Sequence, residues 1–272
     1  MRQILNVANK EFHDGLRNRW LISITVIFAL LSVGLTYFGA AASGEVGVAS
    51  LSTTIASLAS LAVFLIPLIA LLLSYDSFVG EQESGTLLLL LTYPLSKTQL
   101  LLGKFIGQGS IIALATLLGF GSSAILLYFQ SGDSQILIAF GLFIQSAILL
   151  GLSFTAIAYL ISLSVSEKSK AAGFALITWF VFALAFDLAL LALLVGVEDG
   201  VTQQGLTQLM MLNPADIFRL VNLTGLDSND VNGALSVAIK ASLSQAQLLL
   251  TLTAWVVLPL ALANFLFSRK KM

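Results

Sequence analysis

Six apolar stretches, each long enough to cross a bilayer as a helix, constrain this chain more than any other feature. They cover residues 20–38, 55–73, 105–129, 136–163, 171–195 and 248–267. A hydrocarbon core about 30 Å thick needs roughly 20 apolar residues per helix, whereas a barrel would need short alternating strands. Of the 272 residues 58% are hydrophobic and 10% are charged, against a charged share of about 25% in soluble domains. The sequence therefore predicts one all-α polytopic membrane domain, residues 1–272, with six transmembrane helices.

The positions of the lysines and arginines predict the orientation of this domain. All of them except Arg219 and Lys240 fall near residues 2–19, 97–104, 168–170 and 269–271. Clusters of this kind mark the cytoplasmic side of a membrane protein. We therefore expect both termini in the cytoplasm, together with the loops at 75–104 and 164–170. Residues 196–247 then form an outer subdomain between the fifth and sixth helices.

The segment before the first span has an apolar stripe at helical spacing. Ile4, Leu5, Ala8, Phe12 and Leu16 share one face, and charged residues occupy the others. A helix of this pattern lies along the membrane interface. Residues 1–19 are therefore expected to form an interfacial elbow helix, the alternative being a polar tail that only sets the topology.

The chain lacks the residues of the common catalytic sites. Gly103 and Lys104 are followed by Phe105 and have no earlier glycine at the spacing of a phosphate loop. There is no cysteine, and the single histidine, His13, lies in the expected elbow. We expect no catalytic residue, no metal ligand and no cofactor bound by this chain, and no nucleic-acid partner.

The loop at 75–104 is the polar segment with the most distinctive order of residues. An acidic stretch at 76–86 is followed by five leucines at 87–91, a run too short to span. The acidic stretch is predicted to be an exposed knob, and the leucines a short helix or re-entrant turn. Taken alone, these carboxylates could simply solvate a loop.

This order of residues resembles the first cytoplasmic loop of exporter-type permeases of ATP-binding-cassette (ABC) transporters. The match consists of Glu81, then Glu83-x-Gly85-Thr86, the leucine run, Pro94, Lys97 and Gly103-Lys104. The resemblance implies a coupling helix that docks on a cytoplasmic ATPase dimer, and that partner would bind ATP and Mg²⁺. The residues it assigns to this contact are Asp76, Glu81, Glu83, Gly85 and Thr86, with Glu167 and Lys168 in the second cytoplasmic loop.

Segments spread from end to end narrow the resemblance further. Residues 11–20, 54–61, 90–95 and 212–220 are similar to the permease subunits of ABC transporters that process copper for nitrous oxide reductase. The resemblance implies a homodimer in the bacterial inner membrane and a periplasmic copper-handling partner. An exporter of a lipid, drug or sulfur compound is the alternative.

Copper conduction would need soft or imidazole ligands along the path. None of the six spans contains cysteine, histidine or methionine, and Met210 and Met211 lie in the outer segment. The sequence therefore favours a subunit that transmits ATP-driven motion to a periplasmic partner over one that conducts copper.

Asp187 is the one ionisable residue well inside a predicted span. A carboxylate there costs about 2.5–3.5 kcal/mol on insertion scales, so a partner or a polar cavity is expected. Gln145, Ser146 and Asn264 are the candidate partners. Asp187 is either a proton or substrate contact or one side of a hydrogen bond between helices. A membrane enzyme or secondary carrier would need more polar residues at this depth, or an internal repeat.

In the outer segment, Asn213 and Pro214 predict a helix start, with Asn213 as the cap. The apolar face that follows either packs on the mouth of the bundle or is offered to a periplasmic partner. It comprises Ile217, Leu220, Val221 and Leu223. For the second alternative the expected partner contacts are Asn213, Pro214, Asp216, Phe218 and Arg219.

Overall fold

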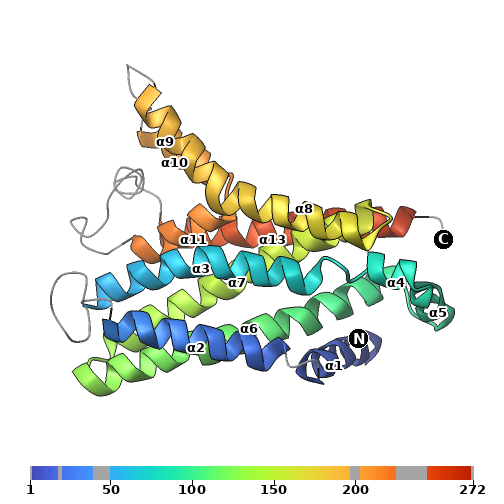
Figure 1. Ribbon diagram of the computed structural model, residues 1–272, viewed down its shortest axis with the longest axis horizontal. Coiled ribbons are helices and arrows are strands. Elements are labelled where there is room, and N and C mark those ends of the chain that lie inside the picture. The colour runs from blue at the N-terminus through green and yellow to red at the C-terminus, as the bar shows by residue number, and fades with distance from the viewer. Residues whose placement is uncertain (1, 18–19, 39–49, 197–202, 225–243, 271–272) are drawn as a thin grey trace.

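The computed structural model describes residues 2–17, 20–38, 50–196, 203–224 and 244–270, and in this part the chain is helical with short turns (Figure 1). In chain order the helices are α1 (Arg2–Arg17), α2 (Trp20–Phe38), α3 (Leu51–Ser74), α4 (Val79–Glu83), α5 (Thr86–Thr92), α6 (Lys97–Ser131), α7 (Gln135–Ser164) and α8 (Lys168–Phe180). A π-helical turn, η2 (Val181–Ala185), joins α8 to α9 (Phe186–Gly196), and α10 (Gln203–Met210), α11 (Pro214–Leu223) and α13 (Gln245–Arg269) follow.

The predicted membrane spans are present as long apolar helices. Five helices of the described part are long and apolar enough to cross a bilayer, and α2 makes a sixth span when it is counted with α1, from which it is bent by 68°. Serine caps set the starts of three of them: Ser50, Ser96 and Ser244 each accept a backbone N–H from the first turn. Residues 197–202 and 225–243 of the expected outer subdomain lie outside the described residues.

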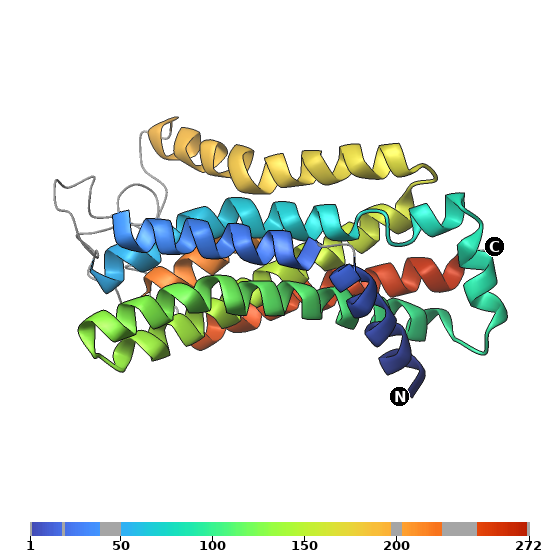
Figure 2. The same cartoon turned by 60° about the horizontal axis from the view of Figure 1, so that its bottom comes forward.

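The long helices lie side by side along one axis (Figures 1 and 2). α7 packs against α3, α6 and α13, and α2 runs along α6. One end of the bundle carries α1, α4, α5 and the last turn of α13, and we call it the elbow end. The turn between α6 and α7 lies at the opposite end. The expected helix at 1–19 is thus confirmed as α1, while its place at a membrane interface stays a prediction.

Glycines on α6 allow α1 to pack against it at backbone distance. A Cβ added at Gly107 would lie 2.7 Å from the carbonyl oxygen of Ala8, and one at Gly103 would lie 2.6 Å from Cβ of Val7. Of the expected apolar stripe of α1, Ala8 is buried and Leu5 is 61% exposed. The face turned to α6 also carries Glu11, whose Cβ would lie 2.6 Å from the Cβ added at Gly107.

The fifth span, formed by α8, η2 and α9, differs from the others in how little of it is covered. Only 11% of its apolar window is buried, against 50% for the spans of α3, α6 and α7. Its fully buried residues in α8 and η2 are small, namely Ala171, Ala175 and Ala183. The span therefore touches the bundle through a narrow strip, to which the large side chains of Trp179 and Phe182 also contribute.

The approach of α1 to α6 yields a test in which two glycines of one helix are compared. Gly107→Ala should lower the free energy of unfolding by about 1–3 kcal/mol, since the new methyl group meets a backbone carbonyl that cannot rotate away. Gly121→Ala should be neutral or gain up to about 1 kcal/mol, since a Cβ added there would have no neighbouring atom within 4 Å. Thermal unfolding in detergent, followed by circular dichroism, measures both. Equal effects at the two positions would show that α1 does not pack on α6 as described.

Candidate functional site

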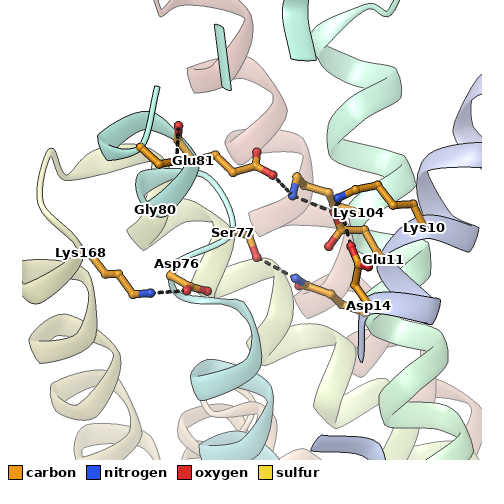
Figure 3. A pocket seen from close by; sticks show the side chains of 11 residues that line it. Lys10, Glu11, Asp14, Asp76, Ser77, Gly80, Glu81, Lys104 and Lys168 are labelled. Atoms are coloured by element: carbon orange, nitrogen blue, oxygen red, sulfur yellow. Dashed lines mark hydrogen bonds and ion pairs between the residues drawn. The ribbon is translucent and has the colours of Figure 1, made fainter. Parts of the chain in front are cut away.

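A buried lysine joins three elements at the elbow end. Lys104 of α6 places its Nζ 3.0 Å from Oε1 of Glu11 in α1 and 2.8 Å from Oε1 of Glu81 in α4 (Figure 3). The lysine side chain is 4% exposed, against 14% for Glu11 and 20% for Glu81. A buried ammonium is tolerated only when it is paired and hydrogen-bonded. We call these three residues the Lys104 cluster. It holds α1 and α4 on α6.

A hydrogen-bonded chain continues from this cluster into the bundle. Gln108, one turn after Lys104, donates from Nε2 to Oγ of Ser77 over 2.8 Å, and the hydroxyl of Tyr159 in α7 donates to Oε1 of Gln108 over 3.0 Å. Oγ of Ser162 accepts the backbone N–H groups of Phe78 and Val79, both over 3.1 Å. The start of α4 is therefore attached to both α6 and α7.

Aromatic packing also holds the start of α4 on the bundle. The ring of Phe78 lies 5.0 Å from that of Tyr159 and 5.0 Å from that of Phe267 in α13, measured between centroids. Edge-to-face pairs at such distances add about 0.5–1.5 kcal/mol beyond area burial. Phe78 and Val79 are 1% and 0% exposed. The first residues of the expected knob are thus core residues of the bundle.

The two polar loops of the elbow end touch each other. Asp76 Oδ2 lies 2.7 Å from Nζ of Lys168, and Oε1 of Glu83 accepts the backbone N–H of Lys168 over 2.6 Å. The carboxylate of Glu83 therefore sits at the start of α8, where free N–H groups and the helix dipole favour an anion. A polar cavity of about 380 Å³ opens between these residues and the Lys104 cluster (Figure 3).

The structure brings together the residues that the sequence assigned to ATPase contact, but it turns some of them inward. The side chains of Asp76 and Glu81 form ion pairs within the chain, and Glu83, although bonded to Lys168, lies on the surface with Gly85 and Thr86. Gly85 has a φ of 73° in the turn between α4 and α5, a left-handed conformation that favours glycine. The leucine run forms α5, confirming a short helix, with Leu88 and Leu89 58% and 64% exposed.

Sequence reasoning missed the residues that hold α4 in place. Glu11, Gln108, Tyr159 and Ser162 lie in segments expected to be an elbow or apolar spans. The available signal was the polarity of the first turns of α6, where Lys104 and Gln108 are spaced one turn apart. Residues at that spacing share a helix face, so the pair predicts a polar stripe that needs partners.

A second polar cluster lies toward the opposite end. Arg219 of α11 places NH1 2.6 Å from Oδ2 of Asp187 in α9 and 3.1 Å from Oδ1 of Asp216. The expected partners of Asp187 were therefore wrong. Ser146, one of them, instead accepts a hydrogen bond from Nδ2 of Asn222 over 2.9 Å. The arginine was missed because it lies 32 residues from Asp187 in the sequence, in a segment expected outside the membrane.

Asn213 connects this cluster to the π-helical turn. Its Oδ1 accepts the N–H of Ala215 over 3.0 Å, confirming the predicted cap. Its Nδ2 donates to the carbonyl oxygen of Phe182 over 2.9 Å and to Oδ2 of Asp216 over 3.1 Å. One amide thus starts α11 and holds it on η2.

Helix α11 is packed inside the bundle. Its predicted apolar face is buried, with Ile217 and Val221 at 0% exposure and Leu220 at 2%. Of the two alternatives for this face, the structure shows packing on the bundle. The residues expected to contact a periplasmic partner are enclosed for the same reason: Asn213, Pro214, Asp216 and Phe218 are buried, and the side chain of Arg219 is 12% exposed.

Burial raises the pKa of Asp216 to about 7. Burial is the largest cause of this net pKa, and the neighbouring Asp187 carboxylate also raises it, while Arg219 and the hydrogen bond from Asn213 act in the opposite direction. Two carboxylates that share one guanidinium cannot both be fully compensated, so one of them holds a proton more readily than it would in water.

Comparison with known proteins agrees with this architecture. Residues 5–272 match the family described as ABC-2 family transporter protein. The chain is 54% identical over 273 residues to the probable ABC transporter permease protein NosY of Pseudomonas aeruginosa, and the match covers 99% of each chain. It is 53% identical over 274 residues to the protein of the same name from Stutzerimonas stutzeri, again with 99% of each chain covered.

The chain therefore belongs to the ABC-2 family of transporter permeases. A permease is the non-catalytic membrane subunit of an ABC transporter and works with an ATPase partner, so the expectation that this chain is no enzyme is confirmed. The resemblance to ABC permeases deduced from the loop at 75–104 is likewise confirmed.

The Lys104 cluster predicts a large difference between two lysines of the elbow end. Lys104→Met should lower the free energy of unfolding by about 3–5 kcal/mol, because Glu11 and Glu81 lose the cation between them in a buried site. Lys10→Met should cost less than about 1 kcal/mol, because the side chain of Lys10 is 56% exposed and Glu11 keeps Lys104 as its buried partner. Chemical unfolding of the purified protein measures both, and a similar small loss at the two positions would refute the buried cluster.

The raised pKa of Asp216 predicts a pH dependence. A carboxyl whose pKa is higher folded than unfolded binds protons more readily in the folded state, so its contribution to stability falls as the pH rises from about 4 to 7. Asp216→Asn removes this term. The melting temperature of the variant, relative to the wild type, should therefore rise between about pH 5 and pH 8. A relative melting temperature that is constant or falls would contradict the shift, and Asp133→Asn, on the exposed turn before α7, is the control.

Proposed function

We propose that this chain is the membrane subunit of an ABC transporter that couples ATP hydrolysis to periplasmic copper-site maturation of nitrous oxide reductase. It works as a homodimer in the bacterial inner membrane, with both termini in the cytoplasm and one ATPase subunit docked on each copy. It transmits motion to a periplasmic copper-handling protein and does not itself conduct copper. The observation that carries the proposal is the end-to-end similarity to two permease proteins named NosY.

The elbow end has the features of an ATPase docking surface. Stable contacts between proteins depend on a few exposed anchors held on a rigid support. Leu88 and Leu89 are exposed on α5, and residues 82–86 form the polar rim beside them. The support is α4, which the Lys104 cluster and Ser162 attach to α6 and α7. The exposed residues Glu167 and Lys168 lie next to Glu83 and extend the same surface.

The polar groups inside the bundle support transmission of motion. The bundle buries hard donors and acceptors: Tyr159 bonds to Gln108 between two spans, and Arg219 of α11 bonds to Asp187 in the fifth span. Such groups fix helices to helices. Copper(I) prefers thiolate, thioether or imidazole ligands, and the spans carry none of these residues.

Charged substitutions on α5 test the docking surface. Leu88→Asp combined with Leu89→Asp should abolish co-purification of the ATPase subunit, since two carboxylates replace the apolar anchors. Cells that carry this variant should make nitrous oxide reductase without its full copper content, measured by elemental analysis of the purified enzyme. Thr98→Asp, exposed in the first turn of α6 near the same end, is the matched control and should retain both properties.

Two results would sink the proposal. One is a wild-type chain that purifies without any ATPase subunit under conditions that keep its own fold intact. The other is a chromosomal deletion of this chain that leaves the reductase with its normal copper content, because the proposed role would then be dispensable.

A further inference from the structure

The fifth span is bonded both to the proposed ATPase contact and to the buried outer helix α11. We propose that α8, η2 and α9 act as a lever that carries motion from α4 at the elbow end to α11 at the opposite end. The inference deepens the proposed function and rests on it. It assigns specific roles to Lys168, Asn213 and Asp187, as residues that position the two ends of the lever.

At the inner end, the lever is attached directly to the coupling helix. Lys168, the first residue of α8, is bonded through its side chain to Asp76 and through its backbone N–H to Glu83. Asp76 lies just before α4, and Glu83 is its last residue. A displacement of α4 therefore acts on the first turn of α8 through an ion pair and a charge-assisted hydrogen bond, which are stronger than neutral ones.

Midway along the span, one bond holds the lever to the bundle. Nε1 of Trp179 donates to the carbonyl oxygen of Phe64 in α3 over 2.9 Å. Phe64 lies in the turn before Pro67, which has no N–H to give to the helix. Close to this bond, the ring of Phe182 packs 5.8 Å from the rings of both Phe154 and Trp255, measured between centroids. Toward the inner end, the fully buried residues of α8 are the small Ala171 and Ala175. This is the geometry of a pivot, because the directional bond and the large side chains lie near one point and only small residues are buried between that point and the inner end.

At the outer end, the lever bends and is attached again. η2 is a π-helical turn, and such turns interrupt the regular ladder of hydrogen bonds and are frequent at functional sites. The carbonyl oxygen of Phe182, in that turn, accepts the amide of Asn213. Five residues further on, Asp187 holds Arg219 over 2.6 Å. Both bonds lead to α11, so a tilt of α9 moves this helix or breaks one of the bonds.

Because the fifth span is sparsely packed, tilting it costs less free energy than tilting any of the other spans. A span with 50% of its apolar window buried must break close packing on several helices of its own chain in order to tilt, whereas this span has 11% of its window buried and breaks fewer such contacts. Packed cores respond as discrete arrangements, so motion concentrates in the element that is least interlocked. Among the described spans that element is α8 with η2 and α9.

The absence of cysteine from the sequence allows a direct test with a single introduced reporter. Val195 in α9 is 87% exposed, so Val195→Cys provides the reporter in the complete complex, reconstituted with its ATPase subunit in lipid nanodiscs. The measurement is the rate of labelling by a membrane-impermeant maleimide, with and without ATP and vanadate. The lever predicts that nucleotide changes this rate.

Breaking the outer bonds should remove the change. Asp187→Asn combined with Asn213→Ala should lose the nucleotide-dependent difference in labelling while the ATPase subunit still co-purifies and hydrolyses ATP. If the double variant does not assemble, Asp187→Asn alone replaces it, since this exchange nearly preserves the shape of the side chain. It should reduce the nucleotide-dependent difference in labelling rate. Asp133→Asn is the matched control and should keep it.

Breaking the inner bond should have the same effect. Lys168→Gln should lose the difference, and the exchange Asp76→Lys with Lys168→Asp should restore it, which a direct ATPase contact by either residue would not do. The inference is overturned if the variants at 187 and 213 keep the difference, or if the wild-type complex shows none while it hydrolyses ATP. Failure of the ATPase subunit to co-purify with the wild type would instead refute the proposed function, a separate readout.

Discussion

The arrangement of the elbow end depends on one desolvated ion cluster. The side chain of Lys104 is 4% exposed, and Glu11 and Glu81 are the carboxylates that pair with it there. Buried ion pairs add little net stability because desolvation offsets their attraction, but loss of one member is costly. The cluster therefore acts mainly as a constraint on position. Its two carboxylates lie 93 and 23 residues before Lys104 in the sequence, and one cation holds α1 and α4 at a common distance from α6.

In the outer cluster, too, single residues join several elements. Asn213 caps α11, holds the π-turn and bonds to Asp216, while Arg219 joins Asp216 to Asp187. Two carboxyl groups and one guanidinium are thus gathered between a loosely packed span and a tightly packed helix. Such a site is stable when all its members are satisfied and sensitive to the loss of any one. A change in the tilt of α9 would alter the distance between Asp187 and Arg219 in this cluster.

Much of the fold follows from the sequence, because a bilayer leaves few alternatives to long apolar helices. The cap at Asn213 was predicted as such, whereas α3, α6 and α13 begin at Leu51, Lys97 and Gln245, before the expected starts at 55, 105 and 248, because serine caps begin them in polar sequence. Pairings across the bundle could not be predicted in the same way. The partners of Asp187 and Lys104 come from helices distant in the sequence, and a single sequence gives the need for a partner without its identity. What covers the apolar face of α11 could not be predicted either, since an amphipathic helix packs equally well on its own chain or on another.

The central claim is that ATP drives motion through this subunit without passage of copper. The most direct test is to reconstitute the permease with its ATPase subunit in sealed proteoliposomes and to measure ATP-dependent movement of radioactive copper(I) across the bilayer, alongside ATP hydrolysis. The account predicts hydrolysis with no copper accumulation above that of vesicles given ATP and vanadate. Copper accumulation that requires ATP and stops with vanadate would contradict it, because a conducting path would then exist through spans that lack soft ligands.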